Sequence, residues 1–191
     1  MSTDVKKQSL SVLVENSAGV LSQVTRLFSR KGYNIESLAV GVTDDPKVSR
    51  ITVILRGTDR MATQLASQLG KLMPVISVQI LTDKKAIYRE FIMVKVRAEN
   101  KDARDEIIQI VNVFRASIVD LSRGSVMIAI TGDESKTEAF LNLLAGFGLM
   151  EIARTGLIAL ERGEGTIHDE SKDRSEYNYG KRIGNDETNE R

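Results

Sequence analysis

The order of predicted strands and helices is the feature that most constrains the fold of this chain, because the same order occurs twice. In the first half, hydrophobic periodicity predicts strands at residues 10–14, 35–42, 49–55 and 75–81 and helices at residues 20–30 and 59–72. After a charged break at residues 82–85, it predicts strands at 91–97, 117–121, 125–130 and 152–160 and helices at 102–114 and 134–145. Each copy therefore has the order βαββαβ.

This element order indicates the α+β fold class, with two tandem ferredoxin-like βαββαβ domains. Because crossover connections are right-handed, few other packings of these elements are allowed. The predicted domains are residues 8–82 and residues 86–163. The helices cover one face of each sheet, and the other face, which we expect to be partly apolar, needs a second domain or another subunit. We therefore expect an oligomer.

Residues 164–191 form a polar tail with few apolar side chains. Such a segment cannot bury enough apolar surface to offset the entropy of ordering, so the composition predicts a disordered tail. The alternative is a docking peptide in which Tyr177 and Tyr179 act as anchors.

Composition excludes several classes of function. The chain has no Cys, and its single His, His168, lies in the polar tail, which excludes thiolate chemistry, a Ser–His nucleophile and a His-rich metal centre. A net charge of +1 attracts neither nucleic acid nor an anionic membrane. No apolar run approaches the roughly 20 residues of a membrane helix, and the N-terminus lacks a signal-peptide core. We expect an intracellular protein with no catalytic residues, metal or cofactor of its own.

The turn between the first strand and the first helix is the best candidate for a binding site. Backbone N–H groups around Ser17, Ala18 and Gly19 point outward at a helix start, where the partial positive charge favours a carboxylate. Asn16 before the turn and Asn34 after the helix each carry a donor and an acceptor, which suits the ammonium and carboxylate of a free amino acid. The apolar side chains expected near the ligand's own are Leu21, Ile35 and Leu38.

A purely structural role explains the same residues. Asn16 would cap, Gly19 would turn, and Asn34 would tolerate a left-handed backbone. Spacing alone favours this structural role over binding.

The segment VLVENSAGVLSQVTRLFSRKGYNIESLAVGVTDDPKVSRITV resembles the N-terminal ACT domain of acetolactate synthase (acetohydroxyacid synthase) small regulatory subunits. The run GYNIESLAVG is close to a signature of that family. Later segments agree, among them REFIMVKV, FRASIVDLS and EIARTGLIALERG, so the resemblance covers residues 8–163. One difference is that many ACT domains have Pro before the turn Gly, where this chain has Ala18.

The resemblance implies an N-terminal ACT domain, a C-terminal ACT-like domain and no catalytic activity. It implies a homodimer formed through the ACT domains, which activates a large catalytic subunit and confers feedback inhibition by valine. Thiamine diphosphate, Mg and FAD are expected only in that catalytic partner. The residues expected to bind valine, at the dimer interface, are Asn16, Ser17, Ala18, Gly19, Val20, Leu21, Asn34 and Ile35.

The alternative function is an ACT-type amino-acid sensor that regulates a different biosynthetic enzyme or a transcription regulator. The near-neutral charge and the lack of a helix-turn-helix pattern argue against the regulator version. The cytoplasm is the expected compartment, because no transit-like segment points to the plastid stroma.

Overall fold

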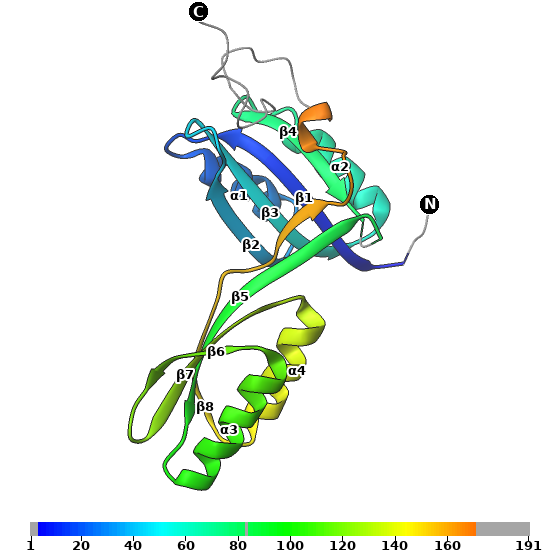
Figure 1. Ribbon diagram of the computed structural model, residues 1–191. Coiled ribbons are helices and arrows are strands. Elements are labelled where there is room, and N and C mark those ends of the chain that lie inside the picture. Colours follow the sequence, from blue (N-terminus) through cyan, green and yellow to red (C-terminus); the bar gives the residue numbers. More distant parts are fainter. Residues whose placement is uncertain (1–3, 83, 171–191) are drawn as a thin grey trace, which may run out of the picture. The chain divides into compact units, whose positions relative to one another are not determined.

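The computed structural model describes residues 4–82 and 84–170, which belong to two compact units (Figure 1). The first unit contains the described residues up to Lys85 and those from Glu161 onward. The second unit is Ala86–Leu160. Each unit has its own sheet, its own pair of helices and its own apolar core.

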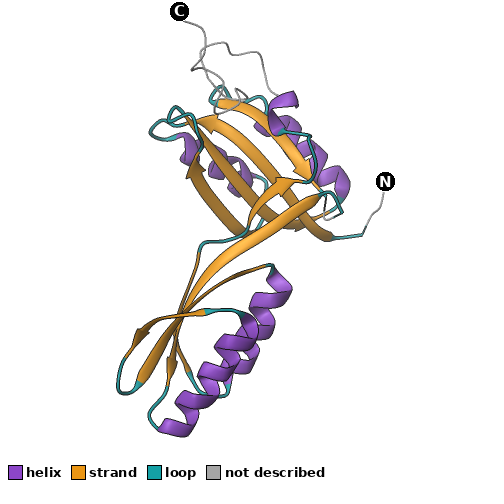
Figure 2. Cartoon of the chain, viewed as in Figure 1, coloured by secondary structure: helices purple, strands orange, loops and turns teal. Residues whose placement is uncertain are grey.

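The first unit is a four-stranded antiparallel sheet with two helices on one face (Figure 2). Its elements are β1 (Lys6–Glu15), α1 (Val20–Arg30), β2 (Ile35–Val42), β3 (Val48–Gly57), α2 (Asp59–Leu69), β4 (Val75–Leu81) and the short 3-10 helix η1 (Ile167–Glu170). The strand order β2-β3-β1-β4 is that of a ferredoxin-like sheet.

Alternation along β1 explains why one face of this sheet is the core. Leu10, Val12 and Val14 are all at most 2% exposed and face α1 and α2, where Val24 and Phe28 complete the apolar layer. Gly32 adopts a left-handed conformation (φ 69°) just after α1, where a helix commonly ends. Helix α2 stops at Leu69, short of the predicted residue 72, and Gly70 after it keeps a right-handed backbone (φ −61°).

The start of α2 carries an ion pair that makes stability depend on pH. Nζ of Lys6 lies 2.8 Å from Oδ1 of Asp59, and Nε2 of Gln8 donates to the same oxygen at 3.1 Å. The hydrogen bonds from Lys6 and Gln8 lower the pKa of Asp59 from its ordinary value of 3.8. The folded state therefore binds the proton less readily than the unfolded chain does, so this stabilisation is complete above the ordinary pKa and is lost as pH falls through the folded one.

We expect Asp59→Asn to lower the melting temperature slightly at pH 7, because an exposed ion pair contributes little. The difference from the unmodified chain should shrink to zero as the pH falls below the folded pKa of this carboxyl. Thermal unfolding followed by circular dichroism across this range is the measurement. Asp102→Asn, which makes the same change in the first turn of α3, controls for the helix dipole. A difference that persists in acid would contradict the assignment.

The second unit repeats the arrangement of the first. Its elements are β5 (Ala86–Arg97), α3 (Lys101–Phe114), β6 (Ser117–Leu121), β7 (Ser125–Gly132), α4 (Glu134–Ala145), β8 (Leu149–Arg154) and β9 (Ile158–Glu161), the last residue of which already belongs to the first unit. The strand order β6-β7-β5-β8 matches the first sheet, and β9 pairs with β5. The predicted fold class, α+β with tandem ferredoxin-like domains, is confirmed.

Helix α4 begins where the sequence predicts, because Oδ1 of Asp133 accepts a hydrogen bond from the backbone N–H of Lys136 at 2.9 Å. Its buried face carries Phe140, whose ring centroid lies 5.2 Å from that of Phe114 on α3. Asn100 caps α3 in the same way, through the N–H of Ala103. Side-chain caps therefore position both helices of the second unit.

The predicted last strand at residues 152–160 is wrong in its extent. The structure has two strands in its place, β8 and β9, and β8 begins earlier, at Leu149. The break lies at Gly156, whose φ of 79° is incompatible with a continuous strand. The hydroxyl of Thr155, beside this break, accepts a hydrogen bond from the backbone N–H of Phe91 at 3.1 Å. Apolar periodicity cannot detect a break that depends on backbone angles.

The helix-free faces of the two sheets differ. In the second unit this face is partly apolar, as expected, and Phe91 and Met93 are each 40% exposed. In the first unit the face is also partly apolar, as expected, but its side chains are buried. Leu13, Ile54 and Leu81 lie there among the buried polar side chains Ser9, Ser11, Thr52, Ser77 and Gln79.

The polar tail also begins differently from the prediction. Ile167 lies within η1 and is 2% exposed, so at least this part of the expected disordered tail is packed. Tyr177 and Tyr179, the proposed anchors, lie outside the described residues. The predicted boundaries of the two domains, residues 8–82 and 86–163, stay predictions.

Candidate effector site

The turn between β1 and α1 presents a helix start without a side-chain cap. Gly19 is the N-cap residue of α1 and has a φ of 84°. The structure describes this helix in full, and no side chain makes a capping hydrogen bond at its start. The N–H of Gln23 is the first to bond into the helix, to the carbonyl of Gly19 at 3.1 Å. The N–H groups of Leu21 and Ser22 precede it and therefore have no intrahelical acceptor. Donors of this kind at the start of a helix are able to bind a small anion.

The charge around this turn favours an anion. The first turn of α1, all of which the structure describes, holds no acidic residue. Asn16, Ser17, Ala18 and Gly19 are exposed, so a ligand has access to the backbone. The helix dipole then adds attraction for a carboxylate.

Asn16 ties the turn to the loop between β2 and β3. Its backbone N–H donates to the carbonyl of Lys47 at 2.7 Å, and its Nδ2 donates to the carbonyl of Pro46 at 2.9 Å. Oδ1 is the acceptor of this side chain, and the bond from Nδ2 to Pro46 fixes the orientation of the amide. Contrary to the structural interpretation, Asn16 therefore does not cap α1 but holds the turn against the loop between β2 and β3.

The loop that holds Asn16 has local hydrogen bonds that the sequence analysis did not single out. Asp45 is 7% exposed, and its Oδ1 accepts from the N–H of Lys47 at 2.8 Å. The hydroxyl of Thr43 accepts from the N–H of Asp45 at 3.2 Å. Such bonds from Asp and Thr to the following backbone are typical of tight turns, so the run TDDP was the available signal.

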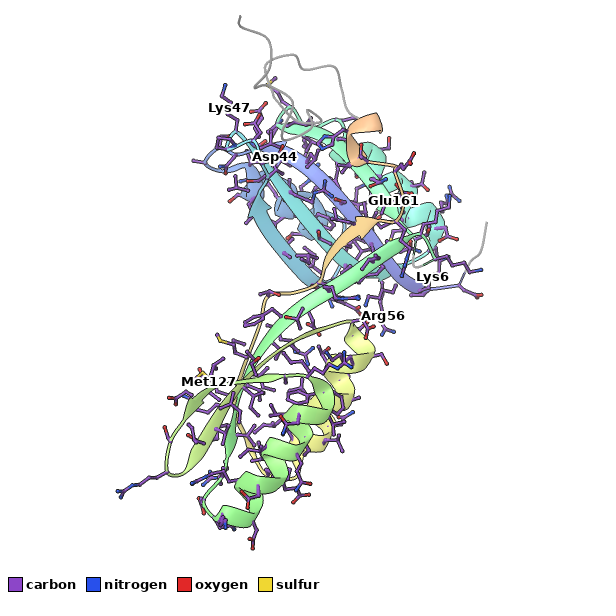
Figure 3. All side chains as sticks on the ribbon, in the orientation of Figure 1. Lys6, Asp44, Lys47, Arg56, Met127 and Glu161 are labelled. Atoms are coloured by element: carbon purple, nitrogen blue, oxygen red, sulfur yellow. The ribbon has the colours of Figure 1, made fainter. Side chains whose placement is uncertain are left out.

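Asn34 and Ile35 do not lie near Asn16 within the chain. They follow the far end of α1, and an 11-residue helix separates the two ends by about 16 Å. Figure 3 shows the same separation through two labelled neighbours. Arg56 is next to Leu55, which pairs with Ile35, and Lys47 is bonded to Asn16; the two labels lie at opposite ends of the first unit. One chain therefore brings together only the part of the predicted site at residues 16–21.

The apolar residues predicted around the ligand fall into two groups. Val20 is 4% exposed and packs into the core, so only its backbone faces the turn. Ile35 and Leu38 are partly buried against the same core, whereas Leu21 is 41% exposed. Val40 and Val42 on β2, which were not among the predicted residues, are 49% and 58% exposed. Strand β2 is also an edge of its sheet. The turn thus lies beside an uncovered apolar edge.

Glu90 in the second unit is a buried carboxylate that the sequence did not indicate. It is 5% exposed, accepts a short hydrogen bond from the hydroxyl of Thr137, and lies 3.6 Å from Nη1 of Arg154. Arg154 also pairs with Glu138 at 2.7 Å. These partners join β5, α4 and β8 and explain the burial of Glu90 without a ligand.

Among residues 4–82 and 84–170, no group of three or more His, Asp or Glu side chains is placed to hold a metal ion. No helix within the same ranges is long and apolar enough to cross a membrane.

Tandem ferredoxin-like units with a glycine-marked turn after the first strand define a protein of the ACT-domain class. A model of the "AHAS small subunit-like ACT domain" matches residues 10–77, and a model of the "Small subunit of acetolactate synthase" matches residues 89–163. The chain belongs to the family of acetolactate synthase small subunits, as its sequence resemblance predicted.

Relatives of known name agree over nearly the same length. The chain is 46% identical to the "Probable acetolactate synthase small subunit" of Methanothermobacter thermautotrophicus, over 83% of this chain and 94% of the relative. It is 43% identical to that of Mycobacterium bovis, over 83% and 94%. The crystal structure of the small subunit from Thermotoga maritima superimposes with a TM-score of 0.78 at 38% identity and covers 84% of this chain and 99% of the other. The family acts in branched-chain amino-acid biosynthesis, and its small subunits are regulatory.

Proposed function

We propose that this chain is the non-catalytic regulatory subunit of an acetolactate synthase, that it binds and activates the large catalytic subunit, and that it confers feedback inhibition by valine. Thiamine diphosphate, Mg and FAD then belong to the catalytic subunit. The observation that supports an effector site in this chain is the exposed, uncapped start of α1 at Gly19. Family membership supports the identity of the partner.

The valine carboxylate accepts hydrogen bonds from the N–H groups at the start of α1, because these donors have no intrahelical acceptor. Oδ1 of Asn16 accepts a hydrogen bond from the ammonium, since Nδ2 of the same side chain is held by Pro46. The backbone at Ser17 and Ala18 forms the wall of the site, and Leu21 contacts the aliphatic side chain.

A dimer through the β2 edge supplies the rest of the site. In a two-fold pair, β2 runs antiparallel to its copy, so the Ile35 end of one strand lies beside the Val42 end of the other. Val42 is at the turn end of the sheet, because it pairs with Ser49, which in turn pairs with Val14. Asn34 of the partner subunit then reaches the turn of this chain. The exposed valines of β2 would be covered in the same step.

Val40→Lys should prevent this dimer, because a lysine on an edge strand opposes strand pairing. We expect a monomeric mass by light scattering at micromolar concentration and loss of valine binding by calorimetry. Val113→Lys is the matched control, since Val113 on α3 is 78% exposed. Valine binding by a monomeric Val40→Lys chain would show that one subunit holds the complete site.

The direct test mixes this chain with its large subunit and measures acetolactate formation with and without valine. We expect activation by the chain and inhibition of the mixture by valine. An allosteric coupling of about 1–3 kcal/mol would leave some activity at saturating valine. If the chain neither activates the large subunit nor makes it sensitive to valine, the proposal fails.

A further inference from the structure

The segment Glu161–Ile167, which we call the strap, packs on the helix-free face of the first sheet. Figure 1 shows η1, which begins at Ile167, beside β4. The family match ends at residue 163, so the buried end of the strap lies beyond it. The hydroxyl of Ser77 on β4 donates to the carbonyl of Ile167 at 3.0 Å.

Ile167 packs into an apolar cluster on the helix-free face. It forms a buried cluster with Leu13, Val48 and Ile76, each of which is fully buried. The spot exists because the pairing of β1 with β4 shifts between Leu13 and Val14, and Ile76 is the extra residue of this bulge. A bulge redirects side chains, and here it places Ile76 with Leu13.

This cluster adjoins the two chain segments that hold the turn at residues 16–19, which we call the effector turn. Leu13 on β1 is three residues before Asn16, which directly follows the end of that strand. Val48 follows Lys47, whose carbonyl accepts the N–H of Asn16, and its own N–H donates to Asp45 at 2.9 Å. Packing of Ile167 on Leu13 and Val48 therefore restrains both chain segments that fix Asn16.

The other end of the strap is anchored as well. Oε2 of Glu161, labelled in Figure 3, accepts from Nε2 of Gln79 at 2.6 Å. The N–H of Arg162 donates to the carbonyl of Lys85. Glu161 is the last residue of β9, so the strap continues directly from a strand that pairs with β5 of the second unit. Six residues along the chain thus join the end of β9 to the cluster beside the effector turn.

We infer that Ile167 is a positioning residue for the effector turn. It deepens the proposed function, on which its ligand-binding part rests. When the strap is docked, the turn is preorganised for the effector, and when it is released, Asn16 and the loop at residues 43–47 loosen. Because linkage is reciprocal, effector binding then stabilises the docked strap.

The test is hydrogen exchange on the full chain without effector, comparing Ile167→Ala with Ile158→Ala. Ile158 is 58% exposed on β9 and is the matched control. Loss of a buried isoleucine side chain should speed exchange of the Asn16 and Val48 amides by about tenfold or more. The amide of Ala62, bonded to Thr58 at the other end of the sheet, is the reference and should not change.

Unchanged exchange at Asn16 and Val48 in Ile167→Ala would overturn the inference. Equal acceleration at Ala62 would also overturn it, because the effect would then be global. If Ile167→Ala does not fold, Ser77→Ala decides, since it removes only the hydroxyl that binds Ile167 and should give a smaller change at the same two amides.

A calorimetric titration with valine separates this inference from the proposed function. We expect Ile167→Ala to bind valine about fivefold more weakly or worse, while Ile158→Ala binds as the unmodified chain does. If the unmodified chain binds no valine, the proposed function fails, and the exchange rates alone still judge whether the strap restrains the turn. Normal valine affinity with loosened amides would overturn the functional part of the inference.

Discussion

Gly19→Asp should abolish the response to valine while activation of the catalytic subunit persists. The new carboxylate would lie where the effector's own carboxylate binds. Two like charges about 5 Å apart at an effective dielectric constant of about 20 repel by about 3 kcal/mol, which corresponds to a loss of more than about a hundredfold in affinity. An added Cβ at Gly19 meets no atom within 4 Å, but the φ of 84° strains any L side chain there, so the control must carry the same strain.

Gly19→Asn is the control that isolates charge. Asn has nearly the same shape as Asp and tolerates the left-handed backbone that Gly19 adopts at φ 84°. We expect it to weaken valine binding only a few-fold in calorimetry and to leave inhibition measurable in the acetolactate assay. Equal losses in both variants would assign the effect to the backbone and not to the carboxylate. Loss of activation as well would place the turn in the interface with the catalytic subunit.

The sequence predicted the turn but not the distance between Asn16, at the turn, and Asn34, which follows α1. Gly19 and Asn16 were found because a strand, a glycine and a helix start follow one another within a few residues, which is local information. Asn34 lies one helix length away, and only the direction of α1 shows that a single chain cannot bring it to Asn16. A site shared between subunits is therefore only half visible in the pattern of one chain.

Two features of the fold depended on non-local contacts and were missed. Gly156 interrupts the last predicted strand through its backbone angle. Ile167 is an isolated apolar residue within a polar stretch, and its burial depends on a bulge more than ninety residues earlier, at Ile76. Periodicity requires several apolar residues in a row, so one anchoring residue gives no signal.

Phe140→Ala should produce the largest loss of stability among single core substitutions in the second unit. Phe140 is fully buried between α3 and the sheet, against Phe114 and the buried strand residues of that core. Truncation of a buried phenylalanine to alanine costs about 3–5 kcal/mol. A unit of this size has a total stability of about 5–15 kcal/mol, so much of it would be lost.

Leu143→Ala on the same helix is the control, because Leu143 is 53% exposed and surface substitutions usually change stability by less than about 0.5 kcal/mol. Urea unfolding followed by circular dichroism should show a lower midpoint for the second unit in Phe140→Ala only. Since the effector turn lies on the other core, this variant should still bind valine at low urea, whereas a Phe28→Ala variant, which damages the core beneath α1, should not. Loss of valine binding in Phe140→Ala, together with one common unfolding transition, would instead mean that the effector turn depends on the second unit for its stability.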